Sequence, residues 1–97
     1  MTSPQTLATF ALLARRCLDA VAEAGAVVDP VAFTTADAVL RFAAGEKVTK
    51  AELKRLSKAC SALTDIKDDA PLQRAFRWQV NALTWLCLMA TSGADHR

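Results

Sequence analysis

The sequence predicts an all-α protein, a compact four-helix bundle with the C-terminal helix at its centre. Four stretches carry apolar residues at helical spacing, and each is bounded by residues typical of helix starts and stops. The composition is 53% hydrophobic, with no tyrosine and three glycines and three prolines in 97 residues, which favours helix and leaves few of the runs that strands need. The last stretch is also unusually apolar around its circumference.

This last stretch, 69–91, is the predicted central helix. On a helical wheel its apolar residues, with Trp78 and Trp85 among them, fill an arc of about 220°, whereas the apolar stripe of a surface helix is roughly 100° or somewhat wider. We therefore expect neighbours on several sides of this helix and a buried Trp85.

Capping residues set the expected boundaries. Ser3, Asp29 and Asp69 each stand one or two residues before a proline, and Thr49 with Glu52 forms a capping box. Thr34 or Thr35 is an alternative start for the second helix. Gly25, Gly45 and Gly93 are the expected stops. The prediction is a single domain, 1–97, with helices at about 4–24, 30–44, 50–66 and 70–91 and a loose tail at 94–97.

The first three helices are expected to be amphipathic. In the first, the apolar arc includes Phe10, Leu13 and Cys17, while Leu12 falls alone in the polar face. In the second, Asp37 and Arg41 face outward at a spacing of four residues, which predicts a favourable ion pair.

The three cysteines, Cys17, Cys60 and Cys87, are widely spaced, and the single histidine is His96. These numbers and spacings argue against a disulfide framework and against a zinc site, so we expect no metal and no cofactor. Each cysteine lies on an apolar stripe, which predicts three buried thiols in a reducing cytoplasm.

Neither a signal peptide nor a membrane span is expected. Residues 1–5 lack a basic region, and Arg15 and Arg16 interrupt the apolar run that follows. The run 78–90 is about 13 residues long, shorter than the roughly 20 residues that span a bilayer. The prediction is a cytoplasmic protein without a membrane partner.

The sequence offers no catalytic constellation. Catalysis by a side chain requires a base or nucleophile near a group that activates it, and the only histidine lies at the end of the sequence. The three glycines are isolated, so they form no phosphate-binding loop. We therefore expect that the protein is not an enzyme.

Binding to a partner is the remaining class of function. A basic cluster lies at the start of the third helix, two further arginines lie on the polar face of the fourth, and one leucine interrupts the polar face in each of the first and fourth helices. The predicted partner-binding residues are Leu12, Lys47, Lys50, Lys54, Arg55, Lys58, Arg74, Arg77 and Leu88.

The run 40–46, the capped Glu52-Leu53 helix and Trp78-Gln79 in a last apolar helix resemble the alanine-rich helical immunity proteins of bacteria. The resemblance covers about 36–86. It implies a bacterial protein of the cytosol that binds a partner protein by its surface, with a toxin as the implied partner.

The leading hypothesis is a non-catalytic bacterial protein-binding module of the immunity or adaptor type. Two alternatives stay open. One is a nucleic-acid-associated regulator that uses the basic face of the third helix, which we disfavour because the net charge is only +2. The other is a homodimeric helical subunit whose fourth helix is buried by a second copy.

Overall fold

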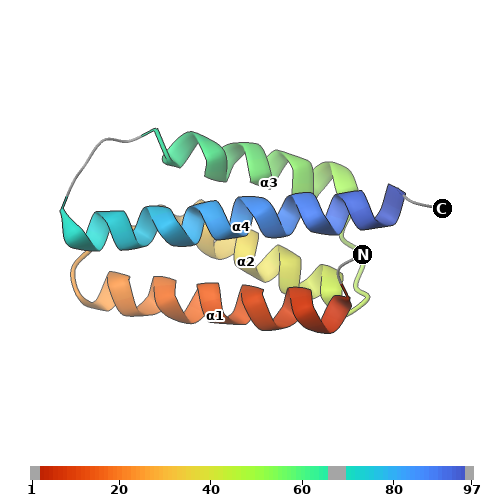
Figure 1. Ribbon diagram of the computed structural model, residues 1–97, viewed down its shortest axis with the longest axis horizontal. Coiled ribbons are helices and arrows are strands. Elements are labelled where there is room, and N and C mark those ends of the chain that lie inside the picture. The colour runs from red at the N-terminus through yellow and green to blue at the C-terminus, as the bar shows by residue number, and fades with distance from the viewer. Residues whose placement is uncertain (1–2, 66–69, 96–97) are drawn as a thin grey trace.

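The computed structural model describes the backbone of residues 3–65 and 70–95, with side chains as far as residue 92. Within these ranges the chain forms four helices, each antiparallel to the next along the chain (Figure 1). They are α1 (Pro4–Glu23), α2 (Pro30–Ala43), α3 (Lys50–Leu63) and α4 (Pro71–Asp95).

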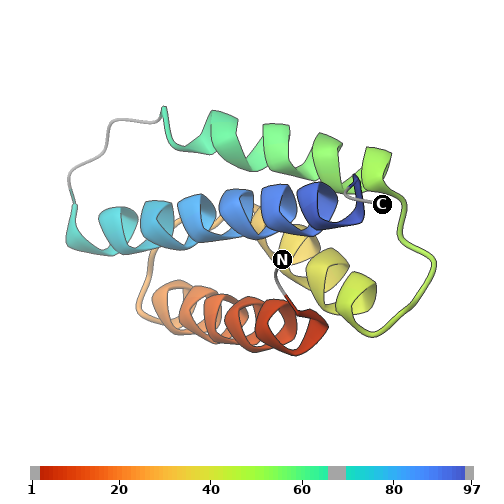
Figure 2. The same ribbon diagram turned by 45° about the vertical axis from the view of Figure 1, so that its right-hand side comes forward.

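The arrangement confirms the predicted all-α bundle. α4 lies between α1 and α3 in Figures 1 and 2, and α2 lies behind α4 in the view of Figure 1. α4 contacts all three other helices, as expected of a central helix, but so does α2, whereas the described parts of α1 and α3 do not contact each other. α2 and α4 therefore form the diagonal that holds the bundle together.

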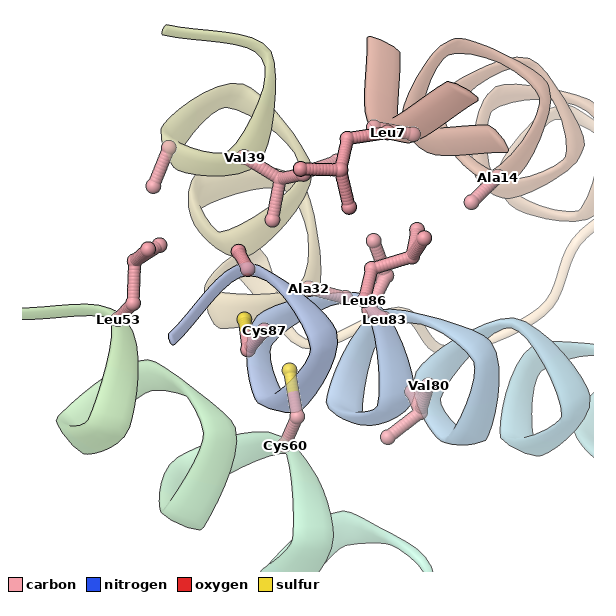
Figure 3. Close-up of a cluster of buried hydrophobic side chains, with 14 of the residues drawn as sticks. Leu7, Ala14, Ala32, Val39, Leu53, Cys60, Val80, Leu83, Leu86 and Cys87 are labelled. Carbon is pink, nitrogen blue, oxygen red and sulfur yellow. The ribbon is translucent and has the colours of Figure 1, made fainter. Parts of the chain in front are cut away.

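The core is formed by one face of each helix. In Figure 3, Leu83 and Leu86 of α4 point toward Leu7 of α1 and Val39 of α2. Alanines at buried positions of α1 and α2 let these helices approach closely, since they leave little side chain between the backbones. The buried apolar residues are Leu7, Ala11, Ala14, Leu18, Ala32, Ala36, Ala38, Val39, Val48, Leu53, Cys60, Phe76, Val80, Leu83, Leu86, Cys87 and Ala90.

Three helix starts lie where the capping signals place them. The Ser3 side chain accepts a hydrogen bond from the Thr6 amide at 3.1 Å, and the Asp29 side chain accepts one from the Val31 amide at 2.9 Å. α2 therefore begins after Asp29, and the alternative start at Thr34 or Thr35 is wrong. Asp69, the expected cap of α4, lies outside the described residues.

The Thr49 hydroxyl oxygen accepts from the Glu52 amide at 3.1 Å, so the threonine half of the capping box is present. Thr49→Ala removes this acceptor and should lower the free energy of unfolding by about 1 kcal/mol. Urea denaturation followed by circular dichroism measures the change. Thr49→Ser keeps the acceptor and is the control, and equal loss in both variants would contradict the capping role.

Two of the three glycine stops are confirmed. Gly25 and Gly45 follow α1 and α2 with φ of 108° and 83°, a left-handed backbone that other residues adopt at a cost. The stop at Gly93 is wrong, because α4 continues through this residue to Asp95. Consequently the predicted loose tail is wrong for residues 94 and 95, and 96–97 lie outside the described residues.

The expected ion pair within α2 is also wrong. Asp37 pairs instead with Arg15 of α1, and Arg41 Nε lies 3.5 Å from Glu46 Oε1 just beyond the helix. The Arg15 guanidinium also lies over the Phe33 ring, 4.8 Å from its centroid. The guanidinium of α1 thus binds two side chains of α2 at once and cross-links the two helices.

The connector between α1 and α2 is tied to the start of α4 by one side chain. The Gln73 Oε1 atom accepts from the Val27 amide at 2.7 Å, and the Gln73 Nε2 atom donates to the Val27 carbonyl at 3.2 Å. The amide and the carbonyl of Val27, in an exposed connector, thus both have a hydrogen-bond partner.

The expected burial around α4 is wrong on its outer face. Trp78 is 76% exposed and Trp85 is 65% exposed. The opposite side of α4 faces the core, and Val80, Leu83 and Cys87 are buried there. The apolar arc of about 220° on α4 therefore has two parts: one part is buried in the core, and the other is exposed on the surface.

Candidate functional site

The predicted partner-binding residues do not form one surface. Leu12, 43% exposed, lies on α1, whereas most of the basic residues lie on α3, which α1 does not contact within the described residues. Lys54, Arg55, Lys58 and Arg74 are exposed, as is Lys47 in the connector before α3, but Lys50 and Arg77 are half-buried.

The structure does bring three of the predicted residues together. Lys54 and Lys58 of α3 line a hollow of 250 Å³ with Leu88 of α4, which is 44% exposed. Its inner wall is formed by Cys87 and Thr91, which are buried. This hollow joins a small apolar area to two lysines, a combination suited to the edge of a protein contact.

A larger apolar surface lies across α1 and α4, and the sequence interpretation missed it. We call it the α1/α4 surface. Its α4 residues recur at intervals of four, three and four, so they form one stripe along the helix, and its α1 residues are three apart. All are exposed, and they are Phe10, Leu13, Trp78, Ala82, Trp85 and Met89.

The centre of this surface is concave. A hollow of 280 Å³ lies between α1 and α4, with buried Ala14 and Leu86 as its floor and Phe10, Leu13 and Trp85 among its walls. The small side chain at Ala14 leaves the space, because a larger residue there would fill it. Gln79 also lines the hollow and contributes its one polar side chain.

The buried cysteines are poor nucleophiles. Cys60 and Cys87 are buried as predicted (Figure 3), and the Cys60 thiol donates to the Thr35 hydroxyl oxygen at 3.1 Å. Burial raises the pKa of the Cys60 thiol. Burial, and then the nearby Cys60, raise the pKa of Cys87 to about 12. Because the thiolate is the reactive form, both thiols are suited to packing.

Cys17 differs from the other two cysteines. It is exposed on α1, and its expected burial is therefore wrong. It lies four residues after Leu13, on the side of α1 that carries the α1/α4 surface. In the part of the chain that the structure describes, no three or more His, Cys, Asp and Glu side chains group so as to hold a metal ion.

Another hollow, of 520 Å³, lies at the end of the bundle where the α1–α2 connector meets α4. Two of its polar residues have structural roles: Asp29 caps α2, and Gln73 binds the Val27 backbone. Its walls include Val28, Leu63 and Phe76, so it resembles a gap in the end packing more than a site with convergent polar groups.

Comparisons with protein-family models, curated proteins and solved structures find no match for this chain. Among the described helices, none has the length and apolar character that crossing a membrane requires.

Proposed function

We propose that the protein is a non-catalytic protein-binding module, of the immunity or adaptor type, and that its α1/α4 surface is the docking site. The observation that carries the proposal is the exposure of both tryptophans, Trp78 and Trp85, on one stripe of α4. A tryptophan left in water forgoes a large burial energy, and tryptophan is enriched among residues that dominate binding energy in interfaces.

The composition of the surface supports a protein partner. The α1/α4 surface contains aromatic residues and a methionine, and none of its six side chains is charged. This composition is typical of the centre of a protein–protein interface. An aromatic side chain can bury about 150–250 Å², so at the observed exposures the two tryptophans alone present on the order of 200–350 Å². Apolar patches of this size on a monomer often mark interaction sites.

The arrangement favours a protein over a nucleic acid. Single-stranded nucleic acid is bound where aromatic side chains and cations share one groove. Here the tryptophans lie on the α1/α4 surface, while Lys54 and Lys58 lie in the hollow between α3 and α4. The basic cluster also contains Glu52, and it lacks an aromatic residue between its lysines.

The cellular setting is part of the same proposal. Three free cysteines, two of them buried, fit a reducing compartment such as the cytoplasm. The resemblance to bacterial immunity proteins supports a bacterial source and a toxin as one class of partner.

Site-specific photocrosslinking in cells that naturally produce the protein tests the proposal. A photoreactive amino acid replaces Trp85 in one variant and Leu88 in another, since both positions are exposed on α4 but face different helix pairs. We expect a discrete protein adduct from position 85 and little from position 88. An adduct with nucleic acid at either position, or no adduct at position 85, would contradict the proposal.

A further inference from the structure

We propose that the protein bound at the α1/α4 surface is a second copy of this chain, related to the first by a two-fold axis that crosses this surface beside the hollow. This inference rests on the proposed function and names its partner. In a two-fold interface the same patch lies on both sides, so the patch must be complementary to itself in shape, charge and hydrogen bonding. The α1/α4 surface meets these three requirements.

Shape is the first requirement. The surface holds projecting side chains, Trp78 and Trp85, beside a hollow of 280 Å³. An aromatic ring of one copy can enter the hollow of the other, and the two-fold axis repeats the same contact in the opposite direction. A purely convex or purely concave patch would not fit its own copy in this way.

Charge is the second requirement. A surface that carries charge at its centre places like charges opposite each other when it meets its own copy, and such pairs are destabilising. The six residues of the α1/α4 surface and the floor of the hollow carry no charged side chain. A second copy therefore brings no like charges together at the centre.

Hydrogen bonding is the third requirement. Gln79 supplies the polar group of the hollow and is half-buried. An amide side chain both donates and accepts, so the Gln79 oxygen of each copy can accept a hydrogen bond from the indole N–H of a tryptophan that the other copy places in the hollow. One amide in an otherwise apolar helix contact is known to fix the register and number of helices.

The available length fits a stable dimer. α1 and α4 have 20 and 25 residues, which at 1.5 Å per residue gives faces of about 30 and 38 Å. A standard interface buries about 800 Å² on each partner. The two tryptophans alone present on the order of 200–350 Å². Four further exposed apolar side chains of the surface, and the polar residues around them, add to this area.

The experiment combines sedimentation with fluorescence, because Trp78 and Trp85 are the only tryptophans in the sequence and both belong to this surface. The chain should sediment at twice its monomer mass at micromolar concentration. On dilution, dissociation should expose the tryptophans to water and shift their emission to longer wavelength. The protein concentration at the midpoint of this shift should equal the concentration at which half of the protein sediments as monomer.

Two neighbouring substitutions on α1 provide matched variants, and both keep the tryptophans. Leu13, 51% exposed, belongs to the surface, whereas Leu12, 43% exposed, faces away from it. Leu13→Glu places two unpaired carboxylates in the interface and should raise the dissociation constant of the dimer on the order of 100-fold. Leu12→Glu should leave this constant within about twofold. Circular dichroism checks that both variants fold.

A wild-type chain that stays monomeric up to about 100 μM, a concentration at which even weak specific dimers form, would overturn the second-copy inference. So would a dimer that Leu12→Glu weakens as much as Leu13→Glu. If the chain is monomeric but position 85 crosslinks to a different protein, the inference fails while the proposed function stands. If position 85 gives no protein adduct, both fail.

Discussion

Leu83→Ala should lower the free energy of unfolding by about 2–5 kcal/mol, whereas Trp85→Ala, two residues along the same helix, should lower it by less than about 1 kcal/mol. Leu83 is fully buried, where α4 meets the other helices, and truncation there leaves a cavity in a close-packed core. Trp85 is 65% exposed, so truncation mostly removes a side chain that already contacts water.

Guanidinium denaturation followed by circular dichroism measures both changes. The protein should be dilute enough to be monomeric, because association through Trp85 would add to the apparent stability of the wild type. The opposite order, with Trp85→Ala the more destabilising in monomeric protein, would mean that the outer face of α4 is covered within the chain.

One thiol of the native protein should react with a thiol reagent at pH 8 on the order of 100-fold faster, or more, than the other two. Cys17 is exposed, whereas Cys60 and Cys87 are buried and the pKa of each is raised by burial. With a pKa of about 12, only about one Cys87 thiol in ten thousand is ionised at pH 8.

The measurement is a time course of labelling, with mass spectrometry to identify the labelled cysteine. Denatured protein should titrate three thiols, matching Cys17, Cys60 and Cys87 in the sequence. Cys17→Ser should remove the fast phase and leave the slow one unchanged. A fast phase that persists in Cys17→Ser would show that a core thiol is accessible.

The helix starts could be predicted from sequence because a cap is a local interaction. Asp29 and Thr49 bind amides two and three residues away, so the sequence contains both partners. The pairing of Asp37 could not be predicted in this way, because Arg15 is 22 residues distant and becomes a neighbour only when α1 packs on α2. Gly93 shows the limit of a local signal, since the helix continues through it.

The candidate site was the harder part to predict, because core and interface residues have the same apolar character. Phe10 and Leu13 lie on the same apolar arc as Leu7 and Ala14, but only the latter two are buried. Which part of an apolar arc is buried depends on where the neighbouring helices pack. A helical wheel shows one helix alone and gives no information about this packing. Leu12 and Leu88 were correctly placed at the surface, because polar residues flank each of them on the helical wheel.

α4 contacts every other helix and is the last of the four to be synthesised, so the time needed for synthesis limits when the bundle can finish folding. About 70 residues separate the end of α1 from the end of α4, a delay of roughly 4–14 s at typical rates of translation. Helical bundles fold in microseconds to milliseconds, so folding must wait for synthesis. During that delay Leu7 lacks its α4 neighbours, and the nascent chain exposes apolar surface that is prone to aggregation.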